Sequence, residues 1–207
     1  NTVSLGGNLL MNVGPTSRGY IDQRAKDALK VYEDWMSVNS RSIYNCTMGN
    51  HEFDYGMERF FELAKMASFP YVSCNFNKNS ELQFAPYVIK EFDGVKIAFV
   101  GVTTPKTLTS STPKYFQDEN GNFIYGFFES ATGEELYNAV QKAVDEARAE
   151  GAAYVIAMAH LGNETSCQPY TYADVIANTT GINAMLDGHS HDMDHVEMLN
   201  KDGDTVL

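Results

Sequence analysis

Three short apolar runs in this chain each lead into a side chain that can bind a metal ion. The runs occupy residues 42–48, 155–159 and 182–186, and the side chains that follow them are those of Asn50, His51, His160, His189 and His191. Runs of this length favour buried strands, and open α/β sheets place their chemistry beyond the carboxyl ends of the strands. Imidazole nitrogens and an amide oxygen suit a borderline transition metal better than calcium or magnesium. The sequence therefore predicts an α/β fold with a metal site at one edge of a sheet.

Strand-like and helix-like patterns alternate along the rest of the chain, as in α/β proteins. Apolar residues at helical spacing predict helices over residues 22–37, 56–67, 134–151 and 172–178. Strands are expected over residues 6–13, 41–47 and 71–76, with hairpins over residues 87–102, around Asp93-Gly94, and 196–207. Residues 103–133 have no clear period, so we expect a long surface excursion there.

The composition excludes several classes of protein. The chain of 207 residues has a formal net charge of −12 and no cluster of Lys and Arg, which a surface for a nucleic-acid polymer would need. No apolar run reaches the length of about 18 residues that a membrane span requires, and the first residues show no signal peptide. Cys46, Cys74 and Cys167 form no C-x-x-C pair, so we expect free or buried thiols.

The hexapeptide Gly49-Asn50-His51-Glu52-Phe53-Asp54 resembles the central signature of the calcineurin-like metallophosphatases. Its extension to Tyr55-Gly56 is similar to the branch of 5′-nucleotidases and 2′,3′-cyclic-nucleotide phosphodiesterases. Further segments agree in the same order, and they are Ser73-Cys74-Asn75, Gly101-Val102-Thr103-Thr104-Pro105, His160-Leu161-Gly162 and Gly188-His189-Ser190-His191. The resemblance covers about residues 48–207. It implies a layered α/β/β/α sandwich, which we expect to be truncated at both ends in this chain.

The resemblance also implies a role for each matching residue. Asn50, His160 and His189 would hold one metal ion, and His191 would hold a second. His51 would meet the phosphate and protonate the leaving oxygen, oriented by Asp54. The ion would be manganese, zinc or cobalt, and the substrate a nucleotide or another small phosphoester. The family location would be extracellular or in the cell envelope, and the oligomeric state stays open.

Several nearby polar residues have plainer interpretations. A single histidine is most often a surface or core residue, and we expect His195 to be one of these. Asp192 and Asp194 are expected to be solvated loop carboxylates, and Glu52 to support its loop. Asp187 is expected to stabilise its loop. Asn75 is expected to be a turn residue or a supporting hydrogen-bond donor, and it is only a weak candidate for substrate binding.

The first part of the chain departs from the metallophosphatase pattern. That family begins with Asp-x-His and then Gly-Asp, and neither motif precedes Asn50, where the sequence has no histidine. We therefore expect one bound ion or none, with impaired activity. Residues 1–47 instead resemble the last strand and helix of the family 29 α-L-fucosidase barrel, through Gly6–Pro15, Gly19-Tyr20-Ile21, Asp34-Trp35-Met36 and Ser40–Tyr44.

Two domains are therefore expected, a fucosidase-like fragment at residues 1–47 and a partial metallophosphatase domain at residues 48–207. This organisation favours a junction of two unrelated genes over a natural one-domain protein. Two alternative functions stay open. One is a catalytically inactive chimeric fragment that binds at most one metal ion. The other is a remnant of an α-L-fucosidase, although the catalytic acid pair expected of a glycosidase is missing from residues 1–47.

Overall fold

The structure is a computed structural model that describes Gln23, Asp27, Lys30 and residues 47–207. It divides into two compact units, Asn1–Tyr44 and Asn45–Leu207. In the first unit the three described residues are helical, and Gln23 Nε2 donates to Asp27 Oδ1 at 2.7 Å. The strands predicted at residues 6–13 and 41–46, and the rest of the helix predicted at residues 22–37, lie outside the described residues. Thr47 and Met48, at the end of the strand predicted over residues 42–48, are not in a strand.

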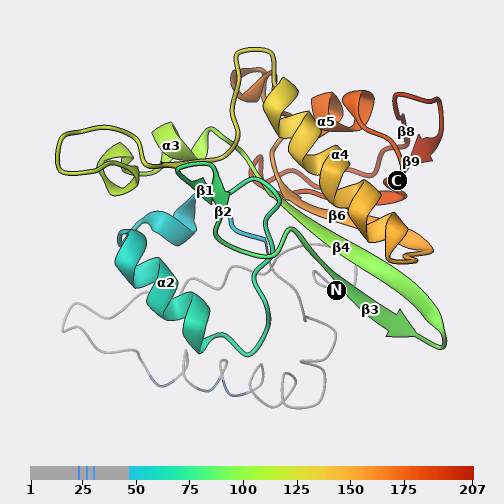
Figure 1. The fold of residues 1–207 in the computed structure, drawn as a ribbon, viewed down its shortest axis with the longest axis horizontal. Coiled ribbons are helices and arrows are strands. Elements are labelled where there is room, and N and C mark those ends of the chain that lie inside the picture. The colour runs from blue at the N-terminus through green and yellow to red at the C-terminus, as the bar shows by residue number, and fades with distance from the viewer. Residues whose placement is uncertain (1–22, 24–26, 28–29, 31–46) are drawn as a thin grey trace. The chain divides into compact units, whose positions relative to one another are not determined.

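A four-stranded mixed sheet forms the centre of the second unit (Figure 1). Its strands, in spatial order, are β3 (Tyr87–Phe92), β4 (Val95–Thr103), β6 (Tyr154–His160) and β7 (Ala184–Leu186). β3 pairs antiparallel with β4, whereas β4, β6 and β7 are parallel. The predicted hairpin is confirmed, and both turn residues, Asp93 and Gly94, have positive φ as a type I′ turn requires.

Helix α4 (Glu134–Ala149) covers one face of this sheet together with α5 (Tyr172–Asn178). The predicted apolar stripe of α4 is confirmed as its buried residues, which are Leu136, Val140, Ala143, Val144 and Ala147. They pack against alternate residues of the strands, which are Ala98, Val100 and Val102 of β4 and Val155, Ala157 and Ala159 of β6. Because side chains alternate along a strand, this packing places His160 on the opposite face, at the carboxyl end of β6.

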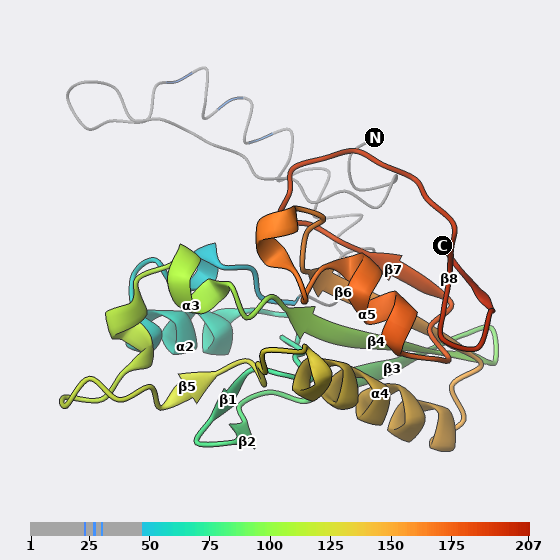
Figure 2. The ribbon, with the colours of Figure 1, turned by 90° about the horizontal axis from the view of Figure 1, so that it is seen from above.

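A second core, made mostly of aromatic rings, lies at the other end of the unit (Figure 2). Its buried members are Met48, Phe53, Phe60, Phe76, Phe116 and Phe127. The elements around it are the 3₁₀ turn η3 (His51–Phe53), α2 (Met57–Met66), β1 (Asn77–Lys78), β2 (Glu81–Leu82), α3 (Thr107–Ser110), η4 (Pro113–Phe116) and β5 (Tyr125–Gly126). The strands β2, β1 and β5 form a three-stranded antiparallel sheet.

Two expectations from the sequence were wrong in this region. Residues 103–133 are not simply a surface excursion, because Phe116 and Phe127 are fully buried in the aromatic core. The strand expected over residues 71–76 is reduced to two bridge residues, Tyr71 and Val72, of which Val72 bridges to Ala85. The Ser73 hydroxyl accepts from the backbone N–H of Asn75 and of Phe76, and such local bonds compete with a strand ladder.

The last part of the chain completes the unit. η5 (Thr165–Cys167) precedes α5, and the predicted C-terminal hairpin is present as β8 (Met198–Leu199) paired antiparallel with β9 (Thr205–Val206). Of the helices in the described part of the chain, none has the length and apolar character needed to cross a membrane.

Candidate metal centre

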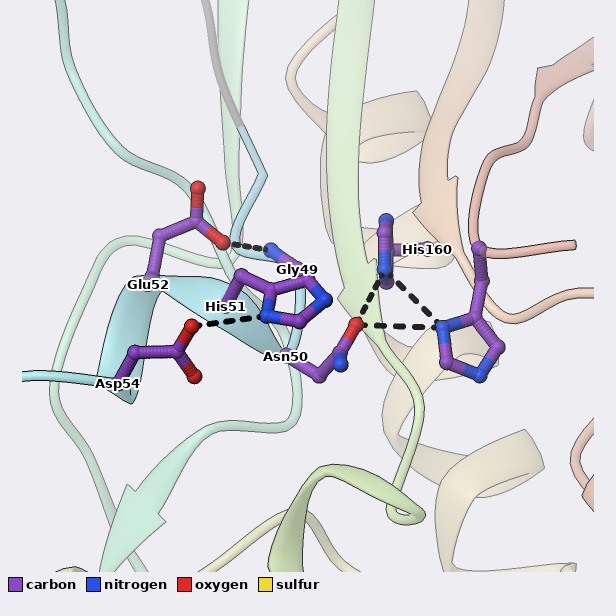
Figure 3. A network of polar contacts seen from close by, with 7 residues as sticks. Gly49, Asn50, His51, Glu52, Asp54 and His160 are labelled. Atoms are coloured by element: carbon purple, nitrogen blue, oxygen red, sulfur yellow. Dashed lines mark hydrogen bonds and ion pairs between the residues drawn. The ribbon is translucent and has the colours of Figure 1, made fainter. Parts of the chain in front are cut away.

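Asn50 stands at the start of η3 with its side chain turned away from the turn. It occupies the N-cap position but makes no side-chain capping bond, although asparagine at this position commonly accepts from the first N–H groups. Its amide is buried and its Oδ1 instead lies 2.9 Å from His160 Nε2 and 3.2 Å from His189 Nδ1 (Figure 3). Asn50 therefore contacts two residues that are distant in the chain instead of capping its own turn.

The three side chains meet at one point. His189 Nδ1 lies 3.2 Å from His160 Nε2, so the two nitrogens and the Asn50 oxygen form a small triangle. The Asn50 oxygen can only accept a hydrogen bond, and at most two ring protons are available for the three contacts. With hydrogen bonds alone, one of the contacts therefore brings together either two lone pairs or two protons. A cation at this point would satisfy all three atoms. Ligands about 2.1 Å from one ion lie about 3.0 to 3.4 Å apart, and the observed separations fall close to that range.

The two histidines are held in the form that can bind a metal ion. Burial, with smaller contributions from the charges of His189, His51 and His191, lowers the pKa of His160 to about 4. Burial is also the main cause that lowers the pKa of His189. Neutral imidazole has the lone pair that a metal ligand requires. The residues present therefore fit one divalent ion bound by two nitrogens and an oxygen.

His51 and Asp54 form a pair beside this triangle. His51 Nδ1 lies 2.9 Å from Asp54 Oδ2, and both side chains are open to solvent. Figure 3 shows the His51 ring between Asp54 and the Asn50–His160 pair. A carboxylate on one ring nitrogen fixes the tautomer and leaves the other nitrogen for exchange of a proton with a substrate.

Aromatic packing and a side-chain hydrogen bond fix the turn that carries these residues. The Phe53 ring is fully buried and contacts four other rings, with centroid distances of 4.8 Å to Phe60, 5.2 Å to Phe116, 5.3 Å to Phe76 and 5.9 Å to Phe127. Glu52 Oε2 accepts from the Gly49 N–H at 2.6 Å, which closes the turn, as expected for a residue that supports its loop. The aromatic core thereby fixes the position of Asn50 and His51.

Strand β4 connects the Asn50 segment to the His160 segment. The Thr103 hydroxyl donates to the Met48 carbonyl at 2.8 Å, and the next N–H, of Thr104, donates to the His160 carbonyl at 3.0 Å. Both threonines are fully buried. Sequence reasoning missed this role, because a threonine near the end of a strand is common and its partner lies 55 residues away.

Two predicted site residues belong neither to the triangle nor to the His51–Asp54 pair. His191 is exposed, and its ring makes no hydrogen bond or ion pair with the part of the chain that the structure describes. Asn75 is fully buried, with Nδ2 donating to the carbonyls of Thr103 and Phe127 and Oδ1 accepting from the Thr103 N–H. The Asn75 amide thus joins buried backbone segments, in keeping with the favoured expectation of a supporting hydrogen-bond donor.

The structure offers no larger set of ligands. Within residues 47–207, no group of three or more His, Cys, Asp and Glu side chains is placed to hold a metal ion. The triangle therefore depends on the asparagine oxygen as its third ligand. Cys74 and Cys167 are buried free thiols that do not contribute to it, and Cys46 lies outside the described residues.

Family models and individual known proteins match different parts of this chain. The family model of the bacterial capsule synthesis protein PGA_cap matches residues 40–205, and the α-L-fucosidase model matches residues 1–41. The trifunctional nucleotide phosphoesterase YfkN of Bacillus subtilis is 31% identical over 159 residues, which are 70% of this chain and 10% of that protein. A 2′,3′-cyclic-nucleotide 2′-phosphodiesterase/3′-nucleotidase of Haemophilus influenzae is 32% identical over 84% of this chain and 26% of its own length.

Solved structures show the same fold. The calcineurin-like phosphoesterase YfkN from Bacillus subtilis superposes with a TM-score of 0.60 at 27% identity, covering 84% of this chain and 56% of that one. A 5′-nucleotidase precursor from Thermus thermophilus gives a TM-score of 0.60 at 23% identity, covering 88% of this chain and 36% of that one. The fold is that of a metallophosphoesterase. The chain belongs to the family of the PGA_cap model and to the calcineurin-like phosphoesterases of the 5′-nucleotidase and 2′,3′-cyclic-nucleotide phosphodiesterase branch.

Proposed function

We propose that this chain is a metal-dependent phosphoester hydrolase that acts on nucleotides or other small phosphoesters. The observation that carries the proposal is the meeting of Asn50, His160 and His189 beside the His51–Asp54 pair. The relatives support the substrate class, since YfkN is named a nucleotide phosphoesterase and the Haemophilus influenzae protein a cyclic-nucleotide phosphodiesterase. The chain spans only 10% and 26% of the length of these two relatives.

Asn50, His160 and His189 would hold one divalent ion of manganese, zinc or cobalt. When bound, such an ion supplies polarisation of a phosphoryl oxygen and a more acidic water. His51 sits beside this point, and its Nδ1 is occupied by Asp54, so its Nε2 is the atom that can face a substrate. His51, when protonated at Nε2, would donate that proton to the leaving oxygen. Before the transfer, the Asp54 carboxylate would stabilise the positive charge of the protonated ring.

We further propose that a second ion binds weakly or not at all. His191 is exposed and no acidic or histidine side chain in residues 47–207 joins it in a group able to hold a metal ion. The sequence before Asn50 contains no histidine that could supply the missing ligands. A clamp of two ions stabilises both the attacking and the leaving oxygen, so turnover should lie far below that of a two-ion enzyme.

The test combines metal content with hydrolysis. Elemental analysis of protein purified without chelator should give close to one divalent ion per chain. Phosphate release from adenosine monophosphate with added manganese should be slow, dependent on metal, and reduced about 100-fold or more in His51→Ala, the range of general acid catalysis. His195→Ala is the matched control, because His195 is exposed and its hydrogen bonds with described residues are limited to that of its backbone N–H to Asp194.

Each alternative gives a different result. Protein that binds no manganese, zinc or cobalt would favour the inactive chimeric fragment. Vigorous turnover would show that other residues replace the missing carboxylates. Release of fucose from an aryl α-L-fucoside, assayed in parallel, would favour the fucosidase remnant, whose residues lie mostly outside the described part of the chain.

A further inference from the structure

The loop after β6 and the loop after β7 are joined by a series of side-chain to backbone hydrogen bonds. Asp187 Oδ1 accepts from the Leu161 N–H at 2.7 Å, and Asp187 Oδ2 accepts from the Gly162 N–H at 2.8 Å. Ser190 Oγ accepts from the next N–H, that of Asn163, at 2.8 Å. Three consecutive N–H groups that follow His160 are therefore all bound by side chains that flank His189.

Two further contacts strengthen this connection. Asn163 Nδ2 donates to Asp192 Oδ2 at 2.9 Å, so the loop 161–163 is bound by three side chains of the opposite loop. Gly162 has a φ of +78°, and a Cβ there would lie 2.8 Å from Ser190 Oγ and 3.0 Å from His189 Cδ2. The backbone at Gly162 thus lies directly against the ring of His189, with no room for a side chain between them.

The backbone at His189 needs such support. His189 has a φ of +81°, in the left-handed region that residues other than glycine rarely adopt. A conformation of this kind persists only where the surrounding structure holds it, and it is often found at functional sites. Asp187 and Ser190, on either side of His189, bind the neighbouring loop and so fix the backbone between them.

Asp187 acts through the backbone and not on the triangle itself. Its carboxylate oxygens are bonded to the N–H groups of Leu161 and Gly162, and neither is bonded to the ring of His160 or His189. The N–H groups that it binds begin one residue after His160, and its own position is two residues before His189. One carboxylate therefore connects the backbone segments that carry the two imidazoles.

We propose that Asp187, assisted by Ser190, is a positioning residue that holds His160 Nε2 and His189 Nδ1 about 3.2 Å apart in readiness for a metal ion. This inference rests on the proposed metal-binding function of the triangle. Residues that orient metal ligands without touching the ion typically contribute 10- to 100-fold to metal affinity. Loss of Asp187 should therefore weaken binding by about that factor, although no ligand is removed.

The experiment is a cobalt titration of the full chain, followed by visible absorption, with the dissociation constant obtained by competition with a chromophoric chelator. The variants are Asp187→Ala, Asp187→Asn and Ser190→Ala. The matched control is Asp118→Ala, because Asp118 also accepts from two backbone N–H groups, those of Asn120 and Asn122, in an exposed loop that contributes nothing to the triangle. Thermal unfolding of the metal-free proteins is measured alongside.

The expected order of affinity is wild type and Asp118→Ala, then Asp187→Asn and Ser190→Ala, then Asp187→Ala at about 10- to 100-fold weaker. Asp187→Asn keeps one acceptor oxygen, so it should recover part of the loss and keep a cobalt spectrum close to that of wild type. In Asp187→Ala the bands at saturation should shift or weaken, because the two imidazoles are no longer held in one geometry. A purely structural role would not change the spectrum of the saturated site.

Other outcomes are decisive. Asp187→Ala that binds cobalt as wild type does, with the same spectrum, would overturn the positioning role and leave the proposed function intact. Affinity losses that follow the metal-free unfolding temperature in all variants, Asp118→Ala included, would also overturn it. Wild-type protein that binds no cobalt would instead refute the proposed function and this inference with it. If Asp187→Ala does not fold, Asp187→Asn and Ser190→Ala decide the question.

Discussion

The side-chain oxygen of Asn50 lies 2.9 Å from Nε2 of His160, although 110 residues separate them in the chain. An asparagine at the start of a helical turn would ordinarily use that oxygen to cap the turn. Here the oxygen instead contacts His160. Burial lowers the pKa of His160 to about 4, so the ring beside the Asn50 oxygen has no permanent positive charge. Together with His189 Nδ1, this oxygen and nitrogen form a set of atoms suited to a cation.

Gly49 should be required for this arrangement. A Cβ at Gly49 would lie 2.8 Å from His160 Cε1, 3.0 Å from His160 Nε2 and 3.1 Å from Glu52 Oε2. We expect Gly49→Ala to displace the His160 ring and to weaken binding of manganese or cobalt by about 10-fold or more. Gly126→Ala is the control, since its nearest atom would lie 3.4 Å away. Equal affinity in the two variants, measured by calorimetric titration, would contradict the close approach.

Phe53 should couple the aromatic core to the turn that carries Asn50. Its ring is fully buried among four others, so Phe53→Ala should lower the free energy of unfolding by about 3–5 kcal/mol. Phe123→Ala is the control, because the ring of Phe123 is 53% exposed and its loss should change stability by about 0.5 kcal/mol or less. Urea denaturation of the metal-free proteins measures both values. Similar losses at the two positions would argue against the packing role of Phe53.

Thr103 should stabilise the connection between the Asn50 and His160 segments. Thr103→Val keeps the shape of the side chain but leaves the buried Met48 carbonyl without its 2.8 Å hydrogen bond, at a cost of about 1–3 kcal/mol. Thr109→Val removes an equivalent bond, from Thr109 Oγ1 to the Lys106 carbonyl, at an exposed position where water replaces it. The difference in urea midpoint between the variants tests the prediction. A Thr103→Val protein as stable as Thr109→Val would show that the buried bond contributes nothing.

Asp54 should matter for turnover more than for metal binding. Asp54→Asn removes the charge that fixes His51 through the 2.9 Å contact, so we expect kcat for adenosine monophosphate to fall by about 10- to 100-fold. The affinity for manganese should change little, since Asp54 is not part of the triangle. Asp145→Asn is the control, because Asp145 is an exposed carboxylate that, within the part of the chain the structure describes, accepts only from the Gln141 side chain. If kcat is unchanged while metal affinity falls, Asp54 serves the metal site and not His51.

Cys74 should be unreactive in the folded protein. Burial raises the pKa of its thiol from the ordinary 9.0 to about 12, so about 10⁻⁴ of it is ionised near pH 8 and alkylation should be very slow until urea unfolds the chain. Because the folded pKa is the higher one, the unfolded chain loses this proton first. The contribution of the protonated Cys74 thiol to the stability of the folded state is therefore intact below about pH 9 and is lost as the pH rises toward 12.

The pH dependence is checked by comparing wild type with Cys74→Ala. The urea midpoint of the wild type should fall more steeply between about pH 8 and pH 10.5 than that of the variant, because only the wild type has this thiol to ionise. Peptide mapping by mass spectrometry identifies the alkylated cysteine. Parallel pH profiles for the two proteins would show that the thiol does not contribute.

The sequence predicted those features that depend on neighbours within a few residues. The apolar stripe of α4 follows from helical spacing, and the hairpin follows from Asp93-Gly94, whose positive φ angles suit the twist of the two strands. The positions of Asn50, His160 and His189 after apolar runs indicated a common site, because parallel strands end at the same edge of a sheet. The residue types at that edge then indicated a transition metal.

Only the tertiary structure decided how these residues are held and which of them meet. The Asn50 oxygen turns from its own turn to two distant histidines, while His191, two residues after His189, stays exposed. Thr103 and Asp187 support the site through carbonyl and N–H groups that lie 55 and 26 residues away. Local spacing reports which face of an element is apolar. It contains no information on which distant backbone group a polar side chain will reach, since that distance is set when the two cores pack.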